Sequence, residues 1–345
     1  MIIVVPYAGM IRIRFEGMIS GLSATPRRLH DRPVRCLVQG YVQRLTIPAL
    51  IVRFVGMKRI ITIQDISCVG KCSLTVALPV ISAMGVEAAI LPTAVLSTHT
   101  MFKGFTFRDL TSDIEPIMEH WENEGFKFDA IYTGYLGSFE QIELMKKLIA
   151  AFKGPKTKVI VDPCMADNGK LYPGFTPEFA KAMATLCAEA DIILPNLTEA
   201  SYMLGEPYVG SGYDEAYVLG LLQRLSKLGA KNVVLKGIDL DKNPKTGVKH
   251  RNKIGIAGYN SEKGTVSWYF HKKMPQNFHG TGDIFASVLT GALVRGVPLQ
   301  EAYALAGDFV AKSIEFTLNE KNHNTYGVNF EQAIPYLVGR LSQYR

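Results

Sequence analysis

Paired cysteines are missing from this sequence. Its five cysteines, at positions 36, 68, 72, 164 and 187, are an odd number, and no two of them are separated by two residues. This pattern argues against a disulfide framework and does not supply the paired ligands of a structural zinc site. It favours a reducing compartment, and we expect a cytoplasmic protein.

Long apolar runs are also missing. The region 76–97 is interrupted by Pro79, Gly85, Glu87 and Pro92, and the apolar runs 1–5 and 47–52 are too short to span a bilayer. We therefore expect no membrane partner. With 48% hydrophobic and 20% charged residues in a chain of 345, the composition predicts a globular protein with a sizeable core.

Lysine does not occur in residues 1–56, although 23 lysines follow Met57. Residues 1–56 hold eight arginines and two acids, whereas residues 57–345 hold 30 basic and 29 acidic side chains. The net charge of +7 therefore does not indicate a basic surface on the main body, and no nucleic-acid partner is expected. We interpret residues 1–56 as an extension outside the fold, from a misassigned start or a targeting segment, and residues 57–345 as one domain.

Short apolar runs alternate with amphipathic stretches after Met57. The runs are apolar on both faces, as in parallel strands that helices cover on each side. We predict a doubly wound α/β fold, with a mostly parallel central sheet flanked by helices on both faces and a small β hairpin or flap over 253–259 and 265–270. The predicted strands are 60–64, 87–91, 129–133, 158–161, 191–194 and 232–235, and the helices include 138–152, 176–189, 213–228, 283–294, 299–316 and 330–341.

The turn Gly280-Thr281-Gly282-Asp283 precedes a predicted helix. Its backbone N–H groups would lie at a positive helix end, which is an anion site, and Asp283 would be placed to take a proton from an attacking hydroxyl. The alternative is a plain capped turn. A dinucleotide-binding turn is excluded because Phe285 stands where a third glycine is needed, and residues 70–73 fail as a Walker A loop because Cys72 stands where Ser or Thr is needed.

Polar or glycine-rich residues follow all six predicted strands. In a doubly wound sheet, ligands bind outside the carboxyl ends of the strands, so we expect these residues to share one edge. They are Asp65, the 97–100 cluster, Gly134 with Tyr135, Asp162 with Asp167, Asn196 with Glu199, and Lys236 with Gly237.

Five segments, in chain order, resemble pyridoxal kinases of the ribokinase-like superfamily from about Met57 onward. They are I-Q at 63–64, T-G-Y-L-G-S at 133–138, D-P-C-M at 162–165, P-N-L-T-E at 195–199 and G-T-G-D at 280–283. The resemblance implies ATP-dependent phosphorylation of the 5′-hydroxymethyl group of pyridoxal, pyridoxine or pyridoxamine. It implies ATP and Mg²⁺, with K⁺ as a further candidate, and a homodimer.

The resemblance also implies roles for individual residues. Asp283 would be the catalytic base, and the N–H groups of Gly280, Thr281 and Gly282 would hold the charge on the transferred phosphoryl group. The positions near the metal and the ATP phosphates would be Asp162, Asn196, Glu199, Lys236, Asp167 and Tyr172, with Asp162 and Glu199 as the metal ligands.

On the acceptor side, the resemblance places Asp65, Thr100 and Tyr135 along the pyridine ring. Asp65 departs from the family pattern, which has Ser after Ile-Gln. A carboxylate there would favour a protonated pyridinium or a ring amine, so the preferred vitamer stays open. His99 lies near the predicted pocket, either as an acid or base or as a hydrogen-bonded structural histidine.

Two other functions remain in view. A hydroxymethylpyrimidine kinase of thiamine synthesis would share the superfamily and use the same anion hole on a smaller ring. A vitamer-binding protein without catalysis would not need a base beside intact glycines, so the presence of Asp283 argues against it.

Overall fold

The computed structural model describes residues 2–7, 10–15, 56–240, 242, 247 and 252–344. The chain divides into two compact units, Met1–Val55 and Gly56–Arg345. In the first unit, strands β1 (Ile2–Tyr7) and β2 (Met10–Phe15) pair antiparallel. The prediction that residues 1–56 lie outside the kinase fold falls mostly outside the described residues, and it stays a prediction.

The second unit is built on a nine-stranded sheet with the order β13-β12-β11-β10-β7-β6-β3-β4-β5. The six predicted strands form its parallel part. Strands β12, β13 and β5 join its two edges antiparallel, so the predicted mostly parallel sheet and hairpin are confirmed. The strands are β3 (Arg59–Ser67), β4 (Glu87–Leu96), β5 (Phe107–Asp109), β6 (Ala130–Thr133), β7 (Lys158–Val161), β10 (Ile192–Ile193), β11 (Asn232–Ile238), β12 (Lys253–Asn260) and β13 (Thr265–Lys272).

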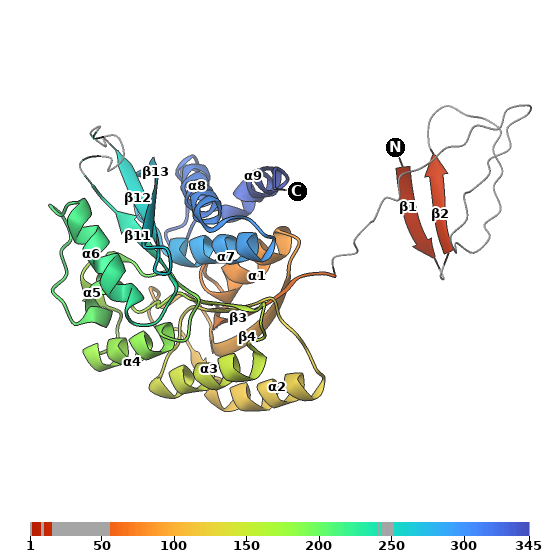
Figure 1. The fold of residues 1–345 in the computed structure, drawn as a ribbon, viewed down its shortest axis with the longest axis horizontal. Coiled ribbons are helices and arrows are strands. Elements are labelled where there is room, and N and C mark those ends of the chain that lie inside the picture. The colour runs from red at the N-terminus through yellow and green to blue at the C-terminus, as the bar shows by residue number, and fades with distance from the viewer. Residues whose placement is uncertain are drawn as a thin grey trace, which may run out of the picture. The chain divides into compact units, whose positions relative to one another are not determined.

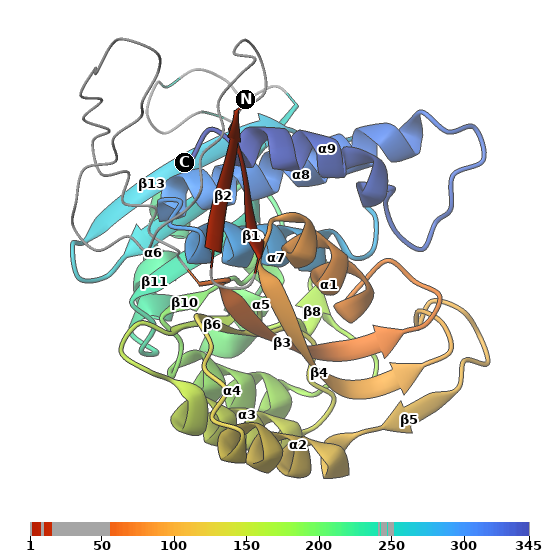
Figure 2. The ribbon, with the colours of Figure 1, turned by 90° about the vertical axis from the view of Figure 1, so that its right-hand side faces the viewer.

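Helices cover both faces of this sheet (Figures 1 and 2). Successive strand residues face opposite sides, so Ile61 and Ile63 pack into one hydrophobic cluster and Ile60 into the other. The first cluster includes α2 (Thr111–Asn123), α3 (Phe139–Phe152), α4 (Pro177–Cys187), α5 (Leu197–Leu204) and α6 (Glu215–Ser226). The second includes α1 (Leu74–Ala83), α7 (Thr281–Val294), α8 (Leu299–Leu318) and α9 (Phe330–Leu341).

Several helix ends form where their capping residues predict them. The side chain of Ser138 accepts a hydrogen bond from the N–H of Gln141 at 3.1 Å, and that of Thr176 accepts one from Phe179 at 3.3 Å. The predicted capping box at Ser138 differs in one contact, because the Gln141 side chain accepts from Gly137 N–H. The Ser138 cap fixes the end of the loop that follows β6, and the Thr176 cap fixes the end of the loop that precedes α4.

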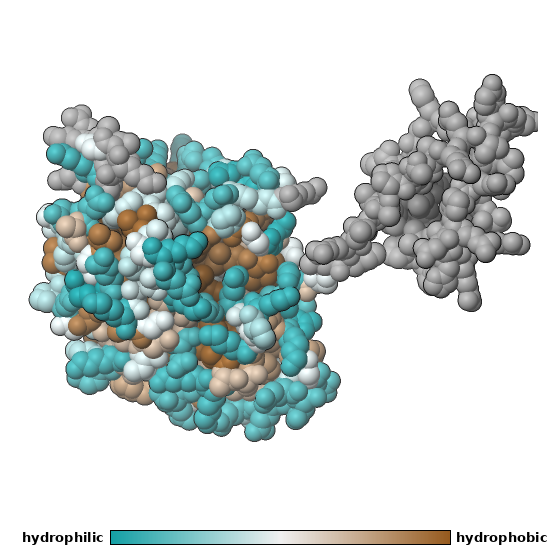
Figure 3. Space-filling model, viewed as in Figure 1, coloured by the Kyte–Doolittle hydropathy of each residue, from teal (hydrophilic) through white to brown (hydrophobic). Residues whose placement is uncertain are grey.

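The visible surface of this unit is hydrophilic over its outer helices, and apolar residues gather toward the middle of the view in Figure 3. Within the part of the chain that the structure describes, no helix is both long and apolar enough to cross a membrane.

Candidate active site

The predicted site residues on the strands lie at the carboxyl ends of the parallel strands. Asp162 follows β7 directly, and Asn196 follows β10 and forms an isolated parallel bridge with Lys236 on β11. Strand β3 is longer than predicted, so Asp65 lies inside it, at an irregularity in its pairing with β4 between Gln64 and Ile66. Asp65 is buried at this irregularity, as are most other residues of the strand.

The glycine turn caps the amino end of α7. Gly280 has a left-handed backbone with φ of 75°, and a Cβ on it would lie 1.8 Å from the carbonyl oxygen of Lys71. Both its conformation and this close approach require glycine. Among the described residues no side chain accepts a capping hydrogen bond at this end of α7, so its first N–H groups remain available to an anion.

Asp283 lies in the first turn of α7 with 8% of its surface exposed. Its Oδ2 accepts a hydrogen bond of 2.9 Å from the backbone N–H of Ser73, which has φ of 49° and ψ of −133°. The pKa of Asp283 is raised to about 7, mainly by burial. The nearby carboxylates of Asp162 and Asp65 also raise it, whereas the Ser73 hydrogen bond and the Lys236 charge lower it. A carboxylate with this pKa is suited to accept a proton near neutral pH.

Asp162 and Lys236 form a buried ion pair behind the glycine turn. The Lys236 ammonium lies 2.9 Å from both carboxylate oxygens, and the side chains of Asp162 and Lys236 are 3% and 15% exposed. Burial alone would lower the pKa of Lys236, but Asp162 and Glu199 together raise it. The lysine is therefore a cation at neutral pH.

Asn196 and Glu199 form a reciprocal capping box at the start of α5. The Asn196 side chain accepts from Glu199 N–H at 2.9 Å, and Glu199 Oε2 accepts from Asn196 N–H at 2.8 Å. Glu199 Oε1 also accepts from Met165 N–H at 3.4 Å, and burial raises the pKa of Glu199 to about 8. These contacts shape the loop after β10, whatever the two residues bind.

A magnesium site is compatible with these residues. Among the described residues, no group of three or more His, Cys, Asp or Glu side chains could hold a metal ion. Mg²⁺ ordinarily takes one or two carboxylates and fills its remaining positions with waters and substrate phosphates. The buried Asp162 carboxylate near the glycine turn fits that requirement, and Glu199 fits it less well because both its oxygens accept backbone hydrogen bonds.

The other predicted phosphate-side residues, Asp167 and Tyr172, lie on a short hairpin beside α5. Strands β8 (Ala166–Asp167) and β9 (Lys170–Leu171) form it. Asn196 donates to the carbonyl of Ala166 at 2.8 Å, which holds the hairpin against the start of α5. Asp167 and Tyr172 are exposed, so both can be reached by a ligand at this rim.

On the acceptor side, Asp65 is 6% exposed and accepts a hydrogen bond from Ser67 Oγ at 3.2 Å. Burial raises the pKa of Asp65. Tyr135 packs against Phe175 with ring centroids 5.6 Å apart, and burial together with the Asp65 charge raises the pKa of Tyr135 to about 12. Asp65, Tyr135 and Asp283 therefore lie close enough for their charges to interact, whereas Thr100 is exposed in a turn.

His99 is half-buried and contacts a residue that sequence reasoning did not assign, His279. Their ring centroids are 4.7 Å apart. His99 Nδ1 accepts from Met101 N–H at 3.1 Å, and burial and His279 lower the pKa of His99 to about 4. A neutral, hydrogen-bonded ring favours the structural alternative for His99.

Lys71 also supports the glycine turn without having been predicted. Besides placing its carbonyl against Gly280, it donates to Asn329 at 3.0 Å and to Glu331 at 2.8 Å. No local pattern in the sequence indicated these contacts of Lys71.

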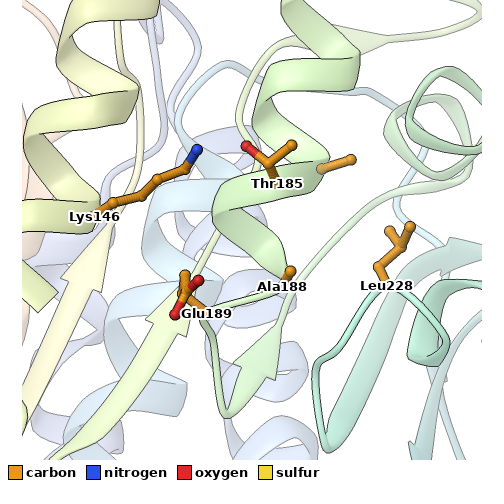
Figure 4. A pocket seen from close by; sticks show the side chains of 6 residues that line it. Lys146, Thr185, Ala188, Glu189 and Leu228 are labelled. Carbon is orange, nitrogen blue, oxygen red and sulfur yellow. The ribbon is translucent and has the colours of Figure 1, made fainter. Parts of the chain in front are cut away.

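The surface hollow in Figure 4 is separate from this site. It is lined by Lys146, Ala184, Thr185, Ala188, Glu189 and Leu228. Glu189 precedes β10 and Leu228 precedes β11, so the hollow lies toward the amino ends of these strands.

Comparisons with known proteins agree with this geometry. A family model described as phosphomethylpyrimidine kinase matches residues 77–328. The hydroxymethylpyrimidine/phosphomethylpyrimidine kinase of Haemophilus influenzae is 26% identical over 276 residues, which cover 76% of this chain and 93% of that protein.

Two solved structures share the fold over most of their length. One is a Bacteroides thetaiotaomicron protein described as a phosphomethylpyrimidine kinase, in a crystal form with pyridoxal. It is 37% identical, with a TM-score of 0.75, and the match covers 82% of this chain and 96% of the Bacteroides chain. The other is pyridoxal kinase from Lactobacillus plantarum, which is 29% identical with a TM-score of 0.74. This match covers 84% of this chain and 100% of the Lactobacillus chain. The predicted resemblance is confirmed at the level of the family. Some of these relatives are named pyridoxal kinase and others phosphomethylpyrimidine kinase. The chain belongs to the phosphomethylpyrimidine kinase family, a ribokinase-like group of ATP-dependent small-molecule kinases.

Proposed function

We propose that this protein transfers the terminal phosphoryl group of ATP to the 5′-hydroxymethyl group of a vitamin B6 vitamer. The observation that supports this most directly is the placement of Asp283. It is a buried carboxylate with a pKa of about 7, in the first turn of a helix whose free N–H groups form an anion site. A hydroxyl that attacks a phosphate held at that turn would approach this carboxylate.

In the proposed reaction, Asp283 accepts the proton of the hydroxymethyl group as its oxygen attacks phosphorus. The N–H groups of Gly280, Thr281 and Gly282 and the Lys236 ammonium stabilise the negative charge of the transferred group. Asp162 would hold Mg²⁺, which supplies further positive charge to the phosphates when bound. Asn196, Glu199, Asp167 and Tyr172 are proposed to complete the nucleotide side, and K⁺ remains a candidate ion.

Asp65, Thr100 and Tyr135 are proposed to line the acceptor ring. Asp65 is the distinctive member, because its buried carboxylate would stabilise a hydrogen-bond donor or a positive charge on the ring. A pyridine ring that carries a proton on its nitrogen meets this requirement. The pyridoxal in the crystal form of the Bacteroides relative supports this choice.

The second candidate function is phosphorylation of hydroxymethylpyrimidine or its phosphate. The family model and the Haemophilus relative favour it, and the exocyclic amine of that ring would also suit Asp65. The two functions share the anion hole and the base, so they differ only in the acceptor.

A parallel phosphorylation assay separates these candidates. Pyridoxal, pyridoxine, pyridoxamine and hydroxymethylpyrimidine are offered separately with ATP and Mg²⁺, and ADP formation is followed. We expect the largest kcat/KM with one of the three B6 vitamers. Turnover of hydroxymethylpyrimidine alone would replace the first proposal by the second, and no turnover with any acceptor would contradict both.

The homodimer and the cytoplasmic location stay predictions. Sedimentation of the purified chain tests the first, and cell fractionation tests the second.

A further inference from the structure

In the ion pair between Asp162 and Lys236, the ammonium group contacts both carboxylate oxygens at the same distance. One ammonium nitrogen lies 2.9 Å from Oδ1 and 2.9 Å from Oδ2 of the same carboxylate. The carboxylate is almost completely buried, with 3% of its side chain exposed. A single cation thus covers both oxygens that Asp162 could offer to any other cation.

The same ammonium also lies against the anion-binding turn. A Cβ built on Gly282 would be 3.9 Å from Lys236 Nζ. The ring of Phe285 limits the ammonium on another side, with its centroid 6.0 Å away. The lysine therefore lies between a carboxylate and the place where phosphoryl oxygens would be held.

The Lys236 side chain can change partners without a change of the backbone. The strand β11 and the bridge to Asn196 fix its main chain, whereas four flexible carbons carry its ammonium group. The ammonium therefore has only a short path from the carboxylate to the glycine turn, since the Cβ position of Gly282 is 3.9 Å from Lys236 Nζ.

We propose that Lys236 is a displaceable counter-ion of Asp162. Asp162 binds either the Lys236 ammonium or a divalent cation, because two cations on the same two oxygens would repel each other strongly in a buried site. When the divalent cation binds, Lys236 moves to the phosphoryl oxygens at the turn. This inference rests on the proposed function, since the phosphate is the partner to which the lysine moves.

The exchange couples the metal to the phosphate. With Lys236 on Asp162 the pair is neutral, and the turn has only its N–H groups to offer an anion. Replacement by a divalent cation brings two positive groups to the phosphates in one step. Lys236 is thus a positioning residue for the metal as well as a proposed phosphate ligand.

The direct test measures Mn²⁺ affinity of the full chain by electron paramagnetic resonance, with neither nucleotide nor acceptor present. Mn²⁺ accepts the oxygen ligands that Mg²⁺ accepts. Lys236→Met removes the competitor, so we expect the Kd for Mn²⁺ to fall by about tenfold or more. Lys236→Arg holds the carboxylate through two N–H groups and should raise that Kd.

Two further variants serve as controls. The double variant D162N/K236M removes both charges and should lose the Mn²⁺ site. Lys58→Met breaks the pair between Lys58 and Asp129, 2.7 Å apart at the amino ends of the strands, and should leave Mn²⁺ binding unchanged. If Lys236→Met does not fold, Lys236→Arg still provides a positively charged partner for Asp162. This variant tests the predicted rise in the Kd for Mn²⁺.

An Mn²⁺ affinity that does not change in Lys236→Met, or in Lys236→Arg where the methionine variant does not fold, overturns the proposal. The parallel acceptor assay keeps this outcome separate from the proposed function. Turnover of a vitamer with unaltered Mn²⁺ affinities would refute only the exchange. Altered Mn²⁺ affinities without turnover of any acceptor would refute both proposed acceptors and leave the cation exchange at Asp162.

Discussion

The backbone N–H of Ser73 donates a 2.9 Å hydrogen bond to Asp283 Oδ2, across 210 positions of the sequence. Ser73 adopts φ of 49° and ψ of −133°, a region that non-glycine residues rarely occupy. The bond fixes one oxygen of the proposed base and leaves the other for an alcohol. It also connects the start of α1 to the start of α7, so the base is held by two elements of the fold.

The glycine turn gives the first prediction. Gly280→Ala should destabilise the protein strongly, because its Cβ would lie 1.8 Å from the Lys71 carbonyl and its φ of 75° disfavours alanine. Gly339→Ala is the matched control, since no atom lies within 4 Å of its Cβ position in α9 and alanine favours helices. Urea unfolding of both variants checks this. If Gly280→Ala and Gly339→Ala unfold at the same urea concentration, the turn tolerates a side chain.

The raised pKa of Asp283 predicts a pH-dependent gain in stability for Asp283→Asn. The folded-state pKa of about 7 exceeds the ordinary value of 3.8, so the folded protein binds this proton more tightly than the unfolded chain. The stability from that proton is present below pH 4 and is lost as the pH rises through 7. Asparagine keeps an acceptor for Ser73 N–H and carries no charge at any pH.

The free energy of unfolding of Asp283→Asn should therefore exceed that of the wild type at pH 8 by more than it does at pH 5. Urea unfolding at both pH values measures the two differences. Asp109→Asn, an exposed residue on β5, is the control and should show no such trend. A difference that is the same at both pH values would mean that Asp283 has an ordinary pKa.

Asp65 predicts a change of acceptor preference. In Asp65→Ser the buried carboxylate is lost, and we expect kcat/KM for acceptors with a protonated ring nitrogen or a ring amine to fall by roughly tenfold or more. Pyridoxine and pyridoxamine, assayed from pH 6 to 8, show the effect, and Asp109→Asn again serves as control. An unchanged kcat/KM for both acceptors would place Asp65 away from the ring.

The amino-terminal segment provides a test of the domain boundary. Deletion of residues 1–56 should leave folding and kcat unchanged, because we interpret the composition shift at Met57 as the start of the kinase fold. The melting temperature and turnover of residues 57–345 are compared with those of the full chain. Loss of folded protein in the shorter chain would move the boundary toward the amino terminus.

Much of the fold could be predicted because its signals are local. The parallel strands are short apolar runs, and the ends of α3 and α4 have Ser138 and Thr176 as caps. Helix α2 was not predicted, because its sequence is mostly polar and it buries only Ile114 and Met118.

The site was predictable where it depends on strand ends. Carboxyl ends of parallel strands meet at one edge, so Asp162 and Lys236 were expected together before their contact was known. The contact of Lys71 with Asn329 and the hydrogen bond from Ser73 to Asp283 join residues more than 200 positions apart. Such contacts depend on how α1, α7 and α9 pack, which no local pattern specifies.

The most direct test of the proposed mechanism is the turnover of Asp283→Asn with the best vitamer, measured together with its affinity for ATP. We expect kcat to fall by roughly 10²- to 10⁴-fold, the usual effect of removing a positioned base, while the Kd for ATP changes little. Near wild-type kcat in this variant would contradict the account, because Asp283 could then not be the group that accepts the proton.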